Sequence, residues 1–174
     1  ASDVYKRQGL YDPEDYDLDI NMWSNSDGYQ IKNLFSRIAK IDLSEDASEL
    51  MNISILINAH YPRKNITEKE FLSLKSDWLI KNSNFDLIKD YLNKNAILND
   101  NPKLSKFFID HYISEFKLDK ACDIFSGNSK PITDEYLSKF NLYCLINDGK
   151  TEEALLKLDL KKEYFQIEKV NEKR

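Results

Sequence analysis

The chain has 174 residues, of which 41% are hydrophobic and 12% aromatic, so it can bury a substantial core as one domain. Its 25 basic and 30 acidic residues are interleaved and give a net charge of −5. Nucleic-acid binding requires a dense cationic face, so we expect no nucleic-acid partner. No apolar run reaches about 18 residues, so we expect no transmembrane segment. With only 4 glycines and 4 prolines, tight turns are few, which disfavours a β-sandwich or barrel.

The first eight residues, ASDVYKRQ, resemble the read-through of a sequencing adapter. We expect residues 1–8 to be a non-native tail, and an ordinary disordered terminus is the alternative. On the first interpretation the natural start is missing, together with any export signal. The lack of a visible signal peptide therefore does not indicate the cytoplasm.

Residues 9–25 form an acidic, aromatic-rich arm. Three apolar residues alternate with acidic or amide residues in it: Leu18, Ile20 and Met22. This period of two predicts an extended segment with one face on the helices, anchored by Tyr16 and Trp23. The acidic spacing faintly resembles a calcium loop but lacks the glycine and the final glutamate that such a loop requires, so we expect no metal there.

Two helices are predicted next. Ser26 or Asp27 can cap the first, whose apolar stripe is Ile31, Leu34, Phe35 and Ile38. Ser44 caps the second, and Tyr61-Pro62 ends it, because proline disfavours helical geometry in the residue before it. The second helix is apolar over much of its girth, so we expect it to be central. Its inward residues are predicted to be Ala47, Leu50, Met51, Ser54 and Ile57 or Ala59.

From Phe71 to Leu158 the sequence repeats itself at a spacing of 33 residues. The matched columns are Phe71/Leu104/Leu137, Leu74/Phe107/Phe140, Ile80/Ile113/Ile146, Asp86/Asp119/Glu152, Ile88/Ala121/Ala154 and Leu92/Phe125/Leu158. This period is typical of stacked helical hairpins, because one hairpin cannot bury its apolar face without a neighbour. Helix starts are predicted at Thr67 with Glu70, at Asn101-Pro102 and at Thr133. Turns and stops are predicted at Asn82–Asn84, Gly127 and Gly149.

Tyr112, Ala121 and Phe125 have a spacing that is similar to part of the tetratricopeptide pattern. The chain departs from that pattern at Ile109, where glycine is usual, and at Ser105, where tryptophan is usual. The resemblance spans roughly the three predicted hairpins. It implies a right-handed stack of antiparallel hairpins, that is, an all-α, tetratricopeptide-like α-solenoid.

We therefore expect an extended acidic N-terminal arm followed by a single α-helical repeat domain at residues 26–160. Residues 161–174 are expected to be a charged tail or a truncated helix, because Tyr164, Phe165 and Ile167 suggest the start of another helix.

Four stretches carry a second resemblance: LYDPEDYDLDINMW, the Leu43–Ala59 helix, KACDIF and KFNLYCLINDGKTEEALLKLDLKKE. They are similar to an uncharacterised family of alphaproteobacterial proteins, some of which carry the automatic label "antifreeze glycopeptide polyprotein". The resemblance implies an exported, all-helical protein, longer than these residues and without an established activity. The label itself has no physical support here, because the threonines are scattered rather than arranged in a flat, regular array.

The two cysteines lie where neighbouring helices of a hairpin stack would meet. Cys122 is placed early in a returning helix and Cys144 late in the next outgoing helix, so their Cα atoms could lie about 5–6 Å apart. A disulfide is one interpretation and would require an oxidising compartment. The alternative is two free thiols in the core. No C-x-x-C is present, so we expect no redox-active pair.

We expect no enzyme, cofactor or metal site. His111 is predicted to be a packed helix residue, and with His60 it is one of only 2 histidines, too few for a metal site unless carboxylates join. No G-x-S-x-G, H-E-x-x-H or phosphate-binding glycine loop occurs.

Six residues would project into the concave face of a tetratricopeptide-like stack: Lys103, Lys106, Asp110, Tyr136, Lys139 and Tyr143. Such an aromatic and basic groove could take an extended acidic peptide, and a solvated helix face is the alternative. The resulting hypothesis is a non-catalytic module that binds or scaffolds an unknown protein or peptide in the periplasm or cell envelope, with the cytoplasm as the alternative location. The other hypotheses are a helical accessory domain of a larger envelope enzyme, and an envelope spacer without a specific ligand.

Overall fold

The structure is a computed structural model, and we describe residues 8–95, 98–126, 128 and 131–160 of it. Within these ranges every regular element is a helix, so the all-α prediction is confirmed there. The α-helices are α1 (Gly28–Ile38), α2 (Glu45–Leu56), α3 (Glu68–Asn82), α4 (Phe85–Asn95), α5 (Pro102–Ser114), α6 (Leu118–Cys122) and α7 (Glu135–Asn147). Two short 3₁₀-helices are η1 (Glu14–Tyr16) and η2 (Asp123–Phe125), and residues 151–160 are also helical.

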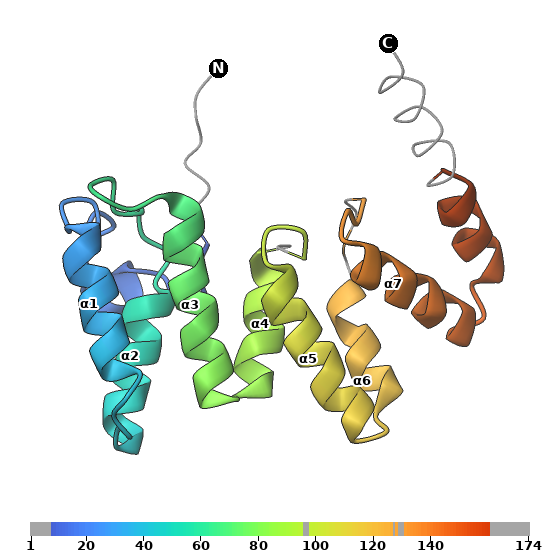
Figure 1. Cartoon of the computed structure of the whole chain (residues 1–174), viewed down its shortest axis with the longest axis horizontal. Helices are drawn as coiled ribbons and strands as arrows, with labels where there is room; N and C mark the ends of the chain where they lie inside the picture. Colours follow the sequence, from blue (N-terminus) through green and yellow to red (C-terminus); the bar gives the residue numbers. More distant parts are fainter. Residues whose placement is uncertain (1–7, 96–97, 127, 129–130, 161–174) are drawn as a thin grey trace, which may run out of the picture.

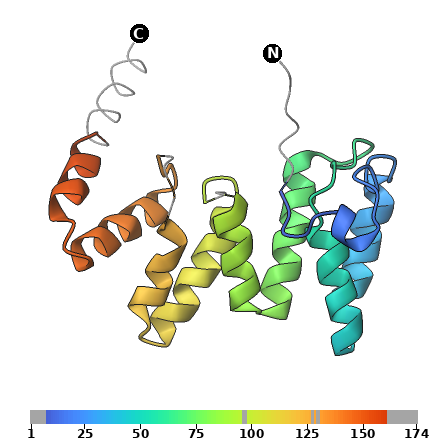
Figure 2. The same ribbon diagram turned by 180° about the vertical axis from the view of Figure 1, so that it is seen from behind.

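The helices follow one another across the molecule in chain order, as Figures 1 and 2 show from opposite sides. From α3 onward they alternate between outgoing helices (α3, α5, α7) and returning helices (α4, α6 and residues 151–160). Helix α5 packs against both α3 and α4, and α7 packs against α5 and α6. Each outgoing helix therefore covers the hairpin that precedes it.

The core runs through these junctions and follows the repeat columns. Phe71, Leu104 and Leu137 are all buried, and so are the members of the Ile88/Ala121/Ala154 column. The largest apolar cluster joins side chains of α2 through α7, with Phe108 of α5 among those without exposed surface. These two columns, one on the outgoing and one on the returning helices, are buried in every repeat. The Ile80/Ile113/Ile146 column is not inward, because Ile113 is 36% and Ile146 57% exposed.

Most helix ends lie where local chemistry predicts. Asp27 and Ser44 cap α1 and α2, Thr67 and Glu70 form a complete capping box, and Asn101 caps α5. Two further predicted turns are confirmed, one between α3 and α4 and one at Gly149, whose φ is 75°. Gly127 lies outside the described residues.

The predicted cap of α7 is wrong by one residue. Asp134 caps the helix, and its side chain accepts a hydrogen bond from the Leu137 amide at 3.0 Å. Thr133 instead donates its own amide to the side chain of Asn99 at 2.9 Å. This bond holds the loop before α7 on the loop before α5, a long-range contact that the local sequence does not report.

Helix α2 differs from its prediction in both its end and its place. It ends at Leu56, not at Tyr61, and Ile57 is extended with ψ of 141°. The cause is the arm, because the amides of Leu10 and Tyr11 both donate to the Leu56 carbonyl and take it out of further helical bonding. The helix lies at one end of the array and Leu50, predicted to be inward, is 66% exposed.

Leu34 of α1 was likewise predicted to be inward and is 52% exposed, because α1 is the first helix of the array.

The arm is a series of turns, which corrects the prediction of an extended segment. The side chains of Asp12 and Asp19 accept hydrogen bonds from amides two residues further on, and such Asx turns bend the chain. Ile20, predicted to face the helices, is exposed. Trp23 is an anchor as predicted and packs 5.6 Å from the ring of Phe71.

The start of the arm is fixed to α4 and to the segment after α2. Lys94 donates to the Leu10 carbonyl at 2.6 Å, and the Asn95 side chain accepts from the Gly9 amide at 3.1 Å. A Cβ at Gly9 would lie 2.5 Å from the Asn58 nitrogen, so only glycine fits this close approach of two backbones. The predicted tail at residues 1–8 is one residue too long, because Gln8 is buried and its carbonyl accepts a hydrogen bond from Lys75 at 2.6 Å. The predictions for residues 1–7 and 161–174 concern positions outside the described residues.

Candidate functional site

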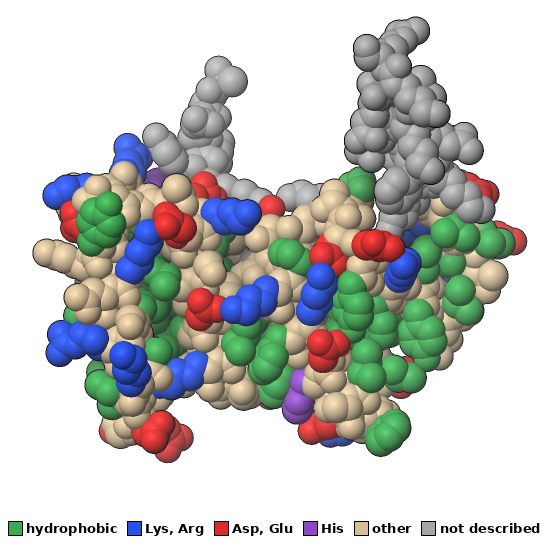
Figure 3. Space-filling model, in the orientation of Figure 1, with side chains coloured by type: hydrophobic (Ala, Val, Ile, Leu, Met, Phe, Trp, Pro, Cys, Tyr) green, Lys and Arg blue, Asp and Glu red, His purple; other side chains and the backbone are tan. Residues whose placement is uncertain are grey.

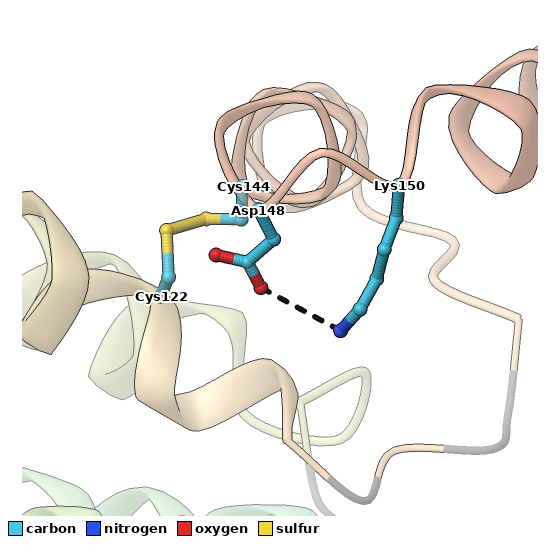
Figure 4. The surroundings of a disulfide bond; sticks show 4 residues. All are labelled: Cys122, Cys144, Asp148 and Lys150. Carbon is cyan, nitrogen blue, oxygen red and sulfur yellow. Dashed lines mark ion pairs between the residues drawn. A yellow bond between two sulfur atoms is a disulfide. The ribbon is translucent and has the colours of Figure 1, made fainter.

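The two cysteines join the last two hairpins. Cys122 is the final residue of α6, not an early one, because α6 has only five residues before the chain tightens into η2. Its sulfur is bonded to that of Cys144 on α7 at 2.04 Å, with the Cα atoms 5.6 Å apart (Figure 4). The alternative of two free thiols therefore does not describe this structure. The bond fixes α7 on the hairpin that it covers.

The six predicted groove residues lie on α5 and α7. We call the exposed side of α3, α5 and α7 the outgoing-helix face. In Figure 3, lysines and acidic residues alternate over its middle, and hydrophobic side chains gather toward α7. The structure brings Lys106, Asp110 and Tyr136 together, because the Tyr136 hydroxyl donates to Asp110 at 2.6 Å and Lys106 lies 5.7 Å from the Tyr136 ring centre.

Ion pairs connect successive helices across this face. Lys103 of α5 reaches Asp77 of α3 at 2.7 Å, and Lys106 of α5 reaches Asp134, the cap of α7, at 2.8 Å. Lys139 pairs within α7, with Glu135 at 2.6 Å. All three predicted groove lysines thus have a carboxylate partner, so their positive charge is balanced locally. The face is not a basic surface that would favour an acidic peptide by charge alone.

Stacked aromatic rings cover the α7 part of this face. Tyr136, Phe140 and Tyr143, which we call the aromatic ledge, stack in a row with centroid distances of 6.4 and 5.7 Å. Tyr136 is 37% and Tyr143 42% exposed. Partial burial, with the hydrogen bond to Asp110, raises the pKa of Tyr136 to about 12, so its hydroxyl stays a proton donor at neutral pH. The ledge exposes ring surface, while the Tyr136 hydroxyl is already bonded to Asp110.

The histidine prediction agrees with the geometry. His111 stacks on Phe85 with ring centres 3.5 Å apart and lies 3.6 Å from Glu115, so it is a packed helix residue. Among the described residues, no group of three or more histidine, cysteine, aspartate or glutamate side chains could hold a metal ion.

Sequence reasoning missed the buried Lys75 of α3. Its ammonium donates to the Gln8 carbonyl at 2.6 Å and lies 5.4 Å from the ring centres of Tyr61 and Phe71. Burial lowers the pKa of Lys75 to about 7. The sequence contains a signal for this burial, because Lys75 lies between Phe71 and Trp78 at helical spacing on the apolar stripe. Lys75 therefore links the arm to α3. Only 1% of its surface is exposed, so a substrate cannot reach it.

The chain was compared with known protein families, curated proteins and solved structures. The comparisons found no matching protein-family profile, no matching curated protein and no matching solved structure. None of the described helices has the length and apolar character to cross a membrane.

Proposed function

We propose that the protein is a non-catalytic interaction module of the helical-repeat type, which binds a protein or peptide segment on the outgoing-helix face. The aromatic ledge of α7 carries the proposal, because exposed tyrosines are enriched where proteins bind one another. Tyrosine supplies a large contact area at a low cost in conformational entropy, and its hydroxyl can bond a peptide backbone. The alternative hypothesis of an accessory domain within a larger envelope enzyme remains a prediction.

The architecture within this proposal is a right-handed, tetratricopeptide-like stack of hairpins. Its support is the burial of matched columns and the packing of α5 on α3 and α4 and of α7 on α5 and α6. In such stacks the outgoing helices line one continuous surface, which is the usual ligand surface of repeat proteins.

The ligand that fits best is recognised by its apolar and hydrogen-bonding groups more than by charge. Lys103, Lys106 and Lys139 are already paired with carboxylates, so an acidic peptide would have to displace those partners. A segment that places aliphatic or proline side chains against the ledge meets no such competition. Binding should therefore depend only weakly on salt.

A peptide-display selection on the complete chain tests the proposal. Affinity for the selected peptides should fall about tenfold or more in Tyr136→Ala and in Tyr143→Ala, since each change removes exposed ring surface from the ledge. Tyr29→Ala is the matched control, because Tyr29 is a 69% exposed tyrosine on α1 at the other end of the molecule. Enrichment no greater than on the bare support, or peptides that tolerate both ledge substitutions, would rule the ledge out as a binding site.

For the location, we propose an oxidising compartment such as the periplasm or cell envelope. The support is the Cys122–Cys144 bond, because cytosolic reductants keep most thiols reduced. Alkylation of the native, unreduced protein should leave both sulfurs unmodified, and alkylation after reduction should modify two. Two accessible or titratable thiols without a reductant would contradict the assignment.

A further inference from the structure

The start of the arm contacts the buried ammonium of Lys75. This lysine is 1% exposed and donates to the Gln8 carbonyl at 2.6 Å. Within the described residues that carbonyl is its hydrogen-bond acceptor, and no carboxylate there forms an ion pair with it. A buried charge without an ionic partner is costly, and an ammonium has three donors to satisfy. The cost of closing the arm therefore depends on whether Lys75 carries its proton.

Other polar groups near this contact are also buried. Gln8 Oε1 and the hydroxyls of Tyr61 and Tyr91 have no hydrogen-bond partner in the part of the chain that the structure describes. The Tyr61 ring centre lies 5.4 Å from the Lys75 ammonium, and Tyr61 interacts electrostatically with Tyr91. Groups of this kind lose their bonds to water on burial. Lifting the arm would return Gln8 and Lys75 to water.

A small set of hydrogen bonds holds the start of the arm closed. We call residues 8–11 the strap. The amides of Leu10 and Tyr11 donate to the Leu56 carbonyl at 2.6 and 3.2 Å, and the Asn58 amide donates to the Tyr11 carbonyl at 2.8 Å. Lys94, at the surface of α4, donates to the Leu10 carbonyl. A segment held in this way can open locally at a lower free energy than the core.

The other titratable groups around this ammonium come from three places. Burial raises the pKa of Tyr61, after α2, and of Tyr91 in α4, so both stay neutral near pH 7. Glu68 of α3 and Asp100 before α5 act on Tyr61, and carboxylates in general ionise well below pH 7. His60 precedes Tyr61 in the chain, and imidazole commonly titrates near neutral pH. His60 therefore requires a control of its own.

We propose that the strap is a pH-dependent closure that opens more often as the pH falls toward 7, because lifting it returns the protonated Lys75 to water. Burial lowers the pKa of Lys75 to about 7 when the strap is closed, against 10.5 for an ordinary lysine. Above pH 7 the closed form sheds the proton and the cost of burying it, whereas the open form keeps the proton. Opening is therefore rarer at pH 8.5 than at pH 7, and it levels off below pH 7. Each opening frees the Leu56 carbonyl and the Asn58 amide.

Hydrogen exchange of the complete chain at pH 7 and pH 8.5, corrected for the intrinsic rate at each pH, tests the proposal. The opening constant of the Leu10, Tyr11 and Asn58 amides should be about tenfold larger at pH 7. These amides should also be less protected than the amide of Phe108, in the core of α5, at both pH values. Equal protection would mean that the strap opens only when the whole protein unfolds, and would overturn the proposal.

Three variants assign the pH dependence to one side chain. Lys75→Met should abolish it, because no proton remains to be released. Lys94→Met is the matched control, since it removes an exposed lysine from the same strap. It should raise the opening constant at both pH values and keep their ratio. His60→Gln should also keep the ratio.

The proposal is overturned if the wild type opens equally at pH 7 and pH 8.5, a comparison that does not depend on any variant. It is also overturned if Lys75→Met keeps the tenfold ratio, or if His60→Gln removes it. The ledge plays no part in these measurements, so the proposed peptide binding can fail without affecting them.

Discussion

Lys75 is the residue with the clearest energetic consequence. Its folded pKa is about 7 against 10.5 for an ordinary lysine, because burial disfavours the charged form. Below pH 7 both the folded and the unfolded states are protonated, and folding carries the full cost of burying the charge. Between pH 7 and 10.5 the folded state loses the proton while the unfolded state keeps it, so the free energy of unfolding rises with pH.

Lys75→Met should therefore stabilise the protein at pH 6 by about 2–4 kcal/mol, because it removes a buried charge and keeps a side chain of similar length. The advantage over the wild type should shrink by about 2–3 kcal/mol at pH 9, where Lys75 of the wild type is neutral. Urea unfolding at the two pH values measures both differences. Lys69→Met, at an exposed position of the same helix, is the control. An advantage that is equal at both pH values would show that burial of the charge is not the cause.

Tyrosines set the upper limit of this pH window. Burial raises the pKa of Tyr61 and of Tyr91 above the ordinary value of 10.0. A raised pKa means that the unfolded state loses these protons first, so stability falls as the pH rises above about 10. The measurements on Lys75 therefore belong between pH 6 and 9.

At the scale of elements, α7 depends on a few strong ties to the rest of the array. Besides its apolar contacts it has the disulfide, the Lys106–Asp134 ion pair and the Tyr136–Asp110 hydrogen bond. Helix α6, on which it rests, is only five residues long and offers little surface. The disulfide therefore has a large share in holding the last hairpin.

Removing the bond by Cys122→Ser with Cys144→Ser should lower the free energy of unfolding by about 3 kcal/mol, given the sequence separation of 22 residues. The physical reason is that the bond limits the freedom of the unfolded chain between the two sulfurs. Hydrogen exchange should accelerate most in α7 and residues 151–160, and least in α3 and α4. Dithiothreitol should reproduce the effect in the wild type and leave the double variant unchanged. A uniform acceleration across all helices would contradict the local role of the bond.

At the scale of the whole molecule, stability should be highest in the middle of the array, where hairpins are covered on both sides. Phe108 of α5 is fully buried and packs near Phe85 of α4 and Tyr112. Phe108→Ala should cost about 3–5 kcal/mol and destabilise the helices on both sides, because each depends on its neighbour. Chemical denaturation combined with hydrogen exchange measures both the size and the spread of the loss.

Phe116→Ala is the matched control for this change. Phe116 is 94% exposed at the turn between α5 and α6, and its φ of 58° lies in the left-handed region that disfavours large residues. Its substitution should change stability by no more than about 0.5 kcal/mol. If both variants lose the same amount, packing in the middle of the array does not decide the stability.

Several features could be predicted from the sequence because they are decided within a few residues. The capping box of Thr67 and Glu70, the start of α5 at Pro102 and the turn at Gly149 are local chemistry. The columns that begin with Phe71 and Ile88 are buried. The repeated period predicts this burial, because the matched positions of each hairpin pack against a neighbouring hairpin. The groove residues were placed on the outgoing helices for the same reason.

The tertiary structure decided what depends on distant partners. Lys103 pairs with Asp77 of a neighbouring helix, so the positive charge of the predicted groove is balanced. Helix α2 ends early because the amides of Leu10 and Tyr11 bind its last carbonyl. The tertiary structure also buries Lys75 beneath the arm. A sequence pattern shows which face of a helix is apolar, but only the assembled array shows whether another helix covers that face. For this reason Leu34, which belongs to the apolar stripe predicted to face inward, is exposed.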